Sequence, residues 1–201
     1  MKFIIITISV FVFSFTLKQK PDFFQKLVSS AVEQTKQLVR YDPAYVQIKY
    51  PNGDVPSNTG VCTDLLIRAY RLTGIDLQKE VHEDMIKRFK DYPQLWKLKT
   101  TDANIDHRRV PNLMTYFNHM GAKLSISEDA NDFKSGDIVS WNLENKNLLS
   151  GVTHIGIVVS QKTVDGKRCL IAHNIGKGNV IEDMLFSYKI IGHYRFKKQN
   201  F

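Results

Sequence analysis

The hydrophobic periodicity of this 201-residue chain changes once, near Gly121, and that change constrains the fold more than any other feature. Before it, apolar residues recur at helical spacing in residues 23–39, 77–89 and 111–120, and in the stretch that follows Cys62. After it come short β-like runs at residues 138–141, 154–159, 168–172 and 190–196. Helices followed by an antiparallel sheet predict an α+β domain. The length favours a single domain.

The connections between these runs carry their own signals. Asp165-Gly166 lies between two of the predicted strands and indicates a hairpin. Asn58 or Thr59 is expected to cap the helix at Cys62, and Gly74 to end it. We expect the buried face of that helix to be made of Leu65, Leu66, Ala69 and Leu72. Residues 41–59 form a long irregular stretch, and so long a loop in a compact domain is usually functional.

The N-terminus has the pattern of a secretory signal. Met1-Lys2 gives a short positive start, residues 3–15 are almost wholly apolar, and Lys18 to Pro21 end the run. The apolar block is shorter than the roughly 20 residues of a membrane span. We therefore expect a signal peptide at 1–20, a single domain at 21–201, and a bacterial protein exported to the periplasm or secreted. It should keep no stable membrane span after cleavage. An uncleaved N-terminal anchor is the alternative.

Cys62 is the first candidate for chemistry, because it follows a glycine and opens a helix. The free N–H groups of a helix N-terminus favour a thiolate, so a lowered pKa and a nucleophilic role are expected. One alternative is a small buried core residue. The other is a disulfide with Cys169, which an exported protein with two cysteines invites. The disulfide would be excluded if His173, four residues further along the same strand, approaches Cys62.

His154 begins a predicted strand, where a side chain can face a cleft, and it is the candidate base for Cys62. A structural histidine is the alternative reading. His173 and Asn174 end the returning strand of the same hairpin. Either can orient the imidazole of His154, and the sequence does not choose between them.

The net charge of +8 comes from scattered basic residues, so nucleic acid is not the expected partner, and an anionic envelope component fits better. Arg108 and Arg109 precede a proline-started helix, where they would hold a substrate carboxylate or simply belong to a solvated turn. No histidine spacing suggests zinc. We expect no cofactor and a monomer.

Several segments resemble the bacterial family called domain of unknown function 1287, and more broadly the papain-like NlpC-type cysteine peptidases. The broader resemblance rests on Cys62 and on residues 136–139, 154–157 and 171–173. The narrower one rests on residues 41–45, 60–64, 81–85, 104–113, 173–176 and 192–195, in that order. The broader resemblance implies a papain-like fold in which N-terminal helices pack on an antiparallel sheet. It also implies that Cys62 is the nucleophile, that His154 is the base, and that His173, with Asn174 its neighbour, holds the third polar position.

These features predict an exported cysteine hydrolase of an amide bond, most plausibly in peptidoglycan stem peptides. The N–H of Cys62 would bind the oxyanion, with Tyr50 and Asp54 as candidates for a second contact. Two alternatives stay open. One is a lipid acyltransferase or thioesterase of the same fold, and the other is a non-catalytic wall-binding module.

Overall fold

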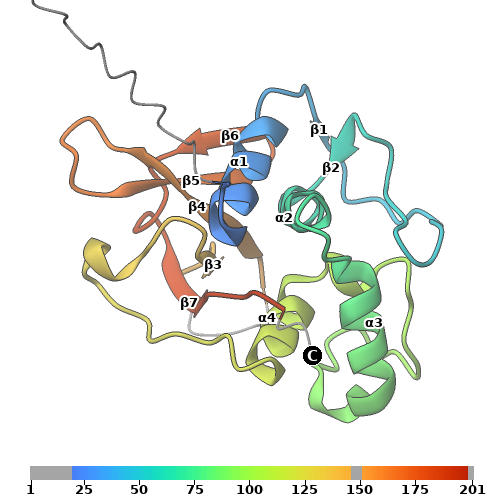
Figure 1. Ribbon diagram of the computed structural model, residues 1–201. Helices are drawn as coiled ribbons and strands as arrows, with labels where there is room; N and C mark the ends of the chain where they lie inside the picture. The colour runs from blue at the N-terminus through green and yellow to red at the C-terminus, as the bar shows by residue number, and fades with distance from the viewer. Residues whose placement is uncertain (1–19, 146–150, 199–201) are drawn as a thin grey trace, which may run out of the picture.

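A computed structural model describes residues 20–145 and 151–198, so the predicted signal segment lies outside the described residues except for Lys20. The architecture is α+β, as the sequence predicts, with helices first and an antiparallel sheet after them (Figure 1). Within the described residues, no helix is both long and apolar enough to cross a membrane.

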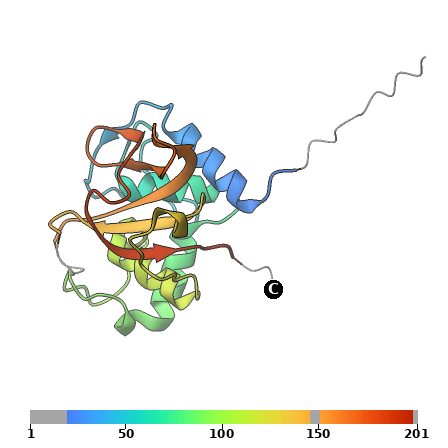
Figure 2. The ribbon, with the colours of Figure 1, turned by 90° about the vertical axis from the view of Figure 1, so that its left-hand side faces the viewer.

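Among the described residues, the first half of the chain contains four α-helices: α1 (Phe23–Gln34), α2 (Cys62–Arg71), α3 (Leu77–Arg88) and α4 (Val110–His119). Their starts follow from local chemistry. Asp22 and Gln25 form a capping box at α1, and Asp76 caps α3 by accepting from the N–H of Gln78. Pro111 lies in the first turn of α4, where its missing N–H costs nothing. In Figure 2, α1 and α2 lie together, and α3 and α4 form a second pair.

The second half forms one antiparallel sheet with the strand order β6–β5–β4–β3–β7. Its strands are β3 (Ile138–Asn142), β4 (Thr153–Lys162), β5 (Cys169–Asn174), β6 (Asn179–Glu182) and β7 (Lys189–Tyr194). The hairpin between β4 and β5 turns where Asp165-Gly166 predicts it, with Gly166 at a φ of 70°. Strand β6 is the one element of this sheet that the sequence analysis missed.

The sheet is buried on both faces. Ile155, Ile157 and Ala172 face the helices, in a cluster with Leu65 of α2 and Phe117 of α4. The alternate residues Val139, Trp141, Val158 and Ile171 face the opposite side, where the segments around Phe133 and Leu185 cover them. A helix that begins at the cysteine and packs on an antiparallel sheet bearing the histidine is the papain-like arrangement that the resemblance implied.

Three local expectations were wrong. The first helix ends at Gln34 rather than near residue 39. Leu72 is 67% exposed, because α2 buries every residue from Cys62 to Tyr70 and ends just before it. The cap of α2 is Val61, because Thr59–Gly60 (β2) pairs in parallel with Arg40–Tyr41 (β1) and is thereby part of a strand.

Candidate active site

Cys62 is the first residue of α2, and the turn that presents it is closed by a carboxylate. The N–H of Val61 donates to Asp64 Oδ2 at 2.7 Å, so Asp64 satisfies a backbone group just before the helix. Arg108 in turn donates two hydrogen bonds to the Asp64 carboxylate, from Nε at 2.8 Å and from Nη2 at 3.0 Å. Asp64 and Arg108 are both buried, and their pairing fixes the helix end that carries the thiol.

The thiol of Cys62 is buried against the start of β4. Its sulfur accepts from the N–H of Ile155, with the N–H groups of Thr63 and Cys62 itself nearby, and each of these donors favours the thiolate. Burial outweighs them and raises the pKa of Cys62 to about 12. The expectation of a lowered pKa is therefore wrong for the resting site, because the gain at the helix end is smaller than the cost of burying a charge.

His154, on β4, belongs to a chain of three titratable side chains. Its Nε2 lies 2.9 Å from His173 Nδ1, on the neighbouring strand β5. His173 Nε2 lies 3.0 Å from Glu182 Oε1, at the end of the edge strand β6. Both imidazoles are buried, whereas the Glu182 side chain is 54% exposed. The chain runs from the start of β4, where His154 lies across from Trp141 of β3, to the solvent edge of the sheet.

The carboxylate at the end of this chain sets the protons along it. An ionised Glu182 can only accept, so it favours the tautomer in which His173 carries its proton on Nε2, although no well-aligned hydrogen bond joins the two groups. The neutral His173 then accepts at Nδ1, and His154 donates from Nε2. His154 Nδ1 is left unprotonated, and no described residue donates to it. Burial, and then the neighbouring His173, lower the pKa of His154 to about 3, so this ring is neutral at ordinary pH.

Gly156 explains how the two imidazoles come so close. A Cβ on Gly156 would lie 2.6 Å from Ile171 Cγ2, 3.0 Å from Ala172 O and 3.2 Å from His173 Cβ. Strand β5 can therefore approach β4 only where β4 has no side chain. The glycine that follows His154 by two residues sets the spacing of the pair.

Asn174 takes a different place from His173. Its Nδ2 donates to Gly60 O at 3.4 Å, and its Oδ1 accepts from the N–H of Gly176 at 3.1 Å. It thus ties the turn after β5 to the strand that precedes Cys62. Of the two residues that the sequence left open, His173 is the one that contacts His154.

A cleft of about 190 Å³ lies beside Cys62. Its walls come from the segment before α2, from the connection between α3 and α4, and from the first residue of β4. They include Tyr41, Pro43, Cys62, Trp96, Arg109 and Thr153. Burial, and then a charge on Cys62, raise the pKa of the Tyr41 hydroxyl, and both residues line the cleft.

The predicted substrate-binding residues divide between this cleft and other places. Arg108 and Arg109 both line the cleft. Tyr50 packs edge-on against His82, with ring centroids 4.9 Å apart. Asp54 is held by Arg68 Nε at 3.0 Å and by Arg71 Nη1 at 3.0 Å. Neither Tyr50 nor Asp54 lines the cleft, and the Asp54 carboxylate is not a hydrogen-bond donor, so the structure does not place them as second oxyanion contacts.

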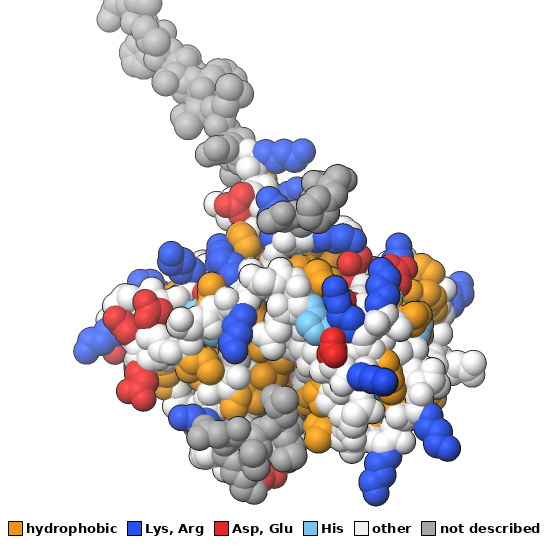
Figure 3. Space-filling view, turned by 90° about the horizontal axis from the view of Figure 1, so that it is seen from below, with side chains coloured by type: hydrophobic (Ala, Val, Ile, Leu, Met, Phe, Trp, Pro, Cys, Tyr) orange, Lys and Arg blue, Asp and Glu red, His pale blue; other side chains and the backbone are white. Residues whose placement is uncertain are grey.

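Cys62 and Cys169 are both free, and Cys169 lies on β5 opposite Lys162, near the hairpin turn. Among the described residues, no group of three or more His, Cys, Asp or Glu side chains could hold a metal ion. Figure 3 shows the Lys and Arg side chains scattered over one face, with no single basic patch there.

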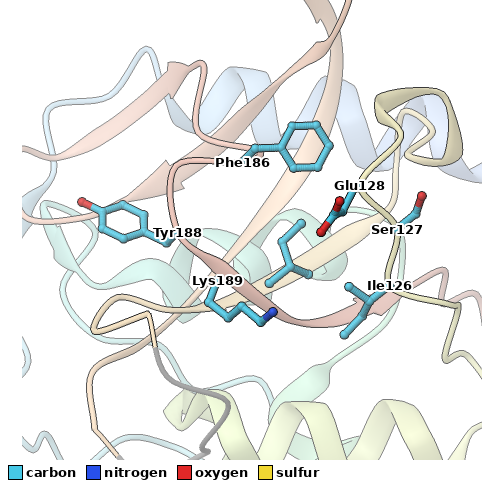
Figure 4. A pocket seen from close by; sticks show the side chains of 7 residues that line it. Ile126, Ser127, Glu128, Phe186, Tyr188 and Lys189 are labelled. Atoms are coloured by element: carbon cyan, nitrogen blue, oxygen red, sulfur yellow. The ribbon is translucent and has the colours of Figure 1, made fainter.

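A second hollow of about 320 Å³ lies along β7, away from Cys62. Figure 4 shows Phe186 and Ile126 beside it, with Glu128 and Lys189 at its rim. No cysteine or histidine lines it. Of the two, only the cleft at Cys62 holds the candidate nucleophile, and it is therefore the candidate active site.

Sequence reasoning missed three residues of this region: Glu182, Trp96 and Tyr41. Tyr41 and Cys62 come together because β1 pairs with β2, the strand directly before Val61 and Cys62. The short motif at residues 41–45 was the one available signal, and it assigned no role to Tyr41. Trp96 and Glu182 carried no signal, because each acquires its neighbours only through the tertiary fold.

The chain is similar to a known family and to a solved structure. The family model "Domain of unknown function (DUF1287)" matches residues 28–196. The "Uncharacterized protein YijF" of Escherichia coli K12 is 50% identical over 170 residues, covering 85% of this chain and 80% of that protein. A crystal structure of an N-acetylmuramoyl-L-alanine amidase from Bacteroides uniformis superposes with a TM-score of 0.46 at 15% identity, over 88% of this chain and 99% of that one. By its sequence, the chain belongs to the domain of unknown function 1287 family.

Proposed function

We propose that the protein is an exported cysteine hydrolase that cleaves an amide bond in the peptide part of peptidoglycan. The observation that carries this proposal is the pairing of His154 with His173, which leaves Nδ1 of His154 without a partner among the described residues. His154 directly precedes Ile155 on β4, and the N–H of Ile155 contacts the Cys62 sulfur. Export and the cell-wall substrate rest on the N-terminal sequence and the basic charge.

The resting site begins with both partners neutral. His154 Nδ1 accepts the thiol proton as Cys62 Sγ attacks the carbonyl carbon, and the pair forms only with substrate bound. The proton then passes to the leaving nitrogen as the C–N bond breaks. Water attacks the resulting thioester as His154 takes its proton; the C–S bond then breaks, the carboxylic acid product leaves, and the proton returns from His154 to the Cys62 sulfur. His173 and Glu182 hold the ring in the tautomer that these transfers need and stabilise the transient imidazolium.

The oxyanion of the tetrahedral intermediate needs donors that are already in place. The N–H of Cys62, at the first position of α2, is one. The hydroxyl of Tyr41 is the second, because Tyr41 lines the same cleft as the sulfur. It takes the place that the sequence analysis offered to Tyr50 or Asp54.

The test is digestion of purified peptidoglycan by the exported protein, with new amino termini and released peptides identified by mass spectrometry. Cys62→Ala should abolish product formation, and Cys169→Ala, the matched cysteine control, should leave it intact. A Cys62→Ala protein that still released the same peptides would rule the mechanism out.

A non-catalytic wall-binding module is favoured by one observation: the Cys62 thiol is buried and protonated and is bonded to a backbone N–H. In that case, binding to peptidoglycan would be unchanged by Cys62→Ala, and neither protein would release peptides. The same digestion, with a pelleting assay beside it, therefore separates the two functions.

A further inference from the structure

The two neighbouring arginines of the cleft differ in what their guanidinium groups already bind. Arg108 donates to both oxygens of Asp64, to Ala44 O at 3.1 Å and to Asp42 O at 3.4 Å. It is buried, and these contacts commit it to the helix end and the preceding loop. Arg108 therefore has a structural role, although the sequence paired it with Arg109 as a substrate ligand.

Arg109 keeps most of its donors unused. Nη1 lies 3.3 Å from Asp106 Oδ1, and Nε and Nη2 have no partner among the described residues. Its guanidinium carbon lies 4.1 Å from the centroid of the Trp96 ring, which fixes the plane of the group. A planar fork with free donors is the shape that receives a carboxylate through two parallel hydrogen bonds.

The carboxylates near Arg109 neutralise its positive charge only in part. Burial lowers the pKa of Arg109, although Asp106 and Asp102 act to raise it. The Asp106 carboxylate also accepts from the N–H of Asp102, so it is shared between two donors. A carboxylate arriving from solvent would add the negative charge that these two residues do not fully supply.

We propose that the cleft beside Cys62 has a subsite for a substrate carboxylate, with Arg109 as its ligand and Trp96 holding Arg109 in place. This rests on the proposed function, because Arg109 and Cys62 line one cleft. The substrate class is then an amide-linked peptide with a free carboxylate close to the bond that is cut. A peptide in which that group is a carboxamide fits poorly, because its NH₂ group meets the donors of Arg109.

The test separates binding from turnover. Cys62→Ala protein is titrated by calorimetry with the tripeptide L-Ala-γ-D-Glu-L-Lys and with the same peptide whose glutamyl α-carboxylate is a carboxamide. We expect the acid to bind at least tenfold more tightly. In the Cys62→Ala protein that also carries Arg109→Met, the affinity for the acid should fall to that for the amide, and the affinity for the amide should be unchanged. Arg168→Met, which removes an arginine paired with Asp183 at the sheet edge, is the matched control and should change neither affinity.

Each other outcome also decides. Equal affinities, a preference that persists in Arg109→Met, or no binding of the acid at millimolar concentration would overturn the subsite. If Arg109→Met does not fold, Arg109→Lys serves instead: it keeps the charge, loses the fork, and should weaken the acid several-fold with the amide unaffected. A clear preference in a protein that hydrolyses no peptide would leave the subsite standing and remove the proposed function.

Discussion

Two histidine–carboxylate clusters lie on this sheet, and their ring nitrogens have different contacts. In the cluster at β3 and β7, His193 Nδ1 lies 3.0 Å from Ser125 O and Nε2 lies 2.9 Å from Asp137 Oδ2, so both ring nitrogens face acceptors. Arg195 adds a bond to the same buried carboxylate. In the cluster at β4, β5 and β6, the chain from Glu182 through His173 stops at His154, whose Nδ1 meets no described donor.

The difference shows how the same groups serve two purposes. A ring with both nitrogens bonded is a fixed crosslink, and here it ties β7 to the segment before β3. A ring with one nitrogen bonded and one free is oriented but still able to take a proton. The first cluster should therefore govern stability, and the second should govern reactivity.

The largest expected effect comes from removing the free nitrogen. His154→Gln should lower the rate of the proposed peptidase reaction by about 10²–10⁴-fold, because proton transfer by a positioned group contributes that much. His193→Gln, the matched change in the other cluster, should leave the rate per folded molecule nearly unchanged. Steady-state kinetics on peptidoglycan peptides, corrected for folded fraction, checks this. Equal losses in the two variants would break the comparison.

The next effect is on stability. Asp137→Asn should lower the free energy of unfolding by about 3 kcal/mol, because it leaves His193 and Arg195 without a buried carboxylate. Glu182→Gln should cost less than about 1 kcal/mol, because its side chain is half-exposed. Urea denaturation followed by tryptophan fluorescence measures both. If Glu182→Gln lost more unfolding free energy than Asp137→Asn, the cluster at β4, β5 and β6 would be the one that governs stability, and the comparison would fail.

Acid should also destabilise the protein through its buried neutral histidines. The folded-state pKa values of His154 and His107 are about 3, below the ordinary value of 6.5. Their stabilising effect is complete above pH 6.5 and is lost as the pH falls toward 3, because the unfolded chain then binds the extra protons. Between pH 6.5 and 5, each should cost roughly 2 kcal/mol. Urea midpoints at pH 7 and pH 5 test this.

In that series, His154→Gln and His107→Gln should each lose part of the acid sensitivity. Wild-type stability that stayed flat down to pH 5 would contradict the buried neutral state of both rings.

The smallest effect sharpens the role of Glu182 as a positioning residue. Glu182→Gln keeps an oxygen that can accept from His173 but loses the charge, so the rate should fall by about tenfold or less. Glu182→Ala loses both and should fall further, while Glu182→Asp should recover part of the rate. The pH–rate profile should shift in the Gln variant. An unchanged profile with unchanged rates would show that the chain ends at His173.

The sequence predicts the α+β order well, because helical and strand periodicities lie in separate halves of the chain. It also predicts His154 at the start of a strand, where alternation of apolar residues is clear. Strand β6 was missed because four residues are too few to show alternation. Glu182 was missed with it, since its approach to His173 depends on the pairing of β6 with β5.

Other errors concern tertiary contacts that no local pattern encodes. Arg108 and Arg109 are adjacent and chemically identical, yet Asp64 engages one and Trp96 stacks on the other. The direction of the Cys62 pKa shift was wrong because helix position is readable from sequence, whereas the burial that outweighs it is not. The pairing of His173, rather than Asn174, with His154 likewise needed the register of two strands.

Helix α2 is buried along nearly its whole length, so the Cys62 sulfur that it carries is held in a fixed position. The other walls of the cleft, at Tyr41, Pro43, Trp96 and Arg109, belong mostly to surface connections outside the long helices and the sheet. A descendant of this protein could thus come to accept a new molecule through sequence changes in those connections alone. The position of the sulfur and the packing of the interior would stay the same.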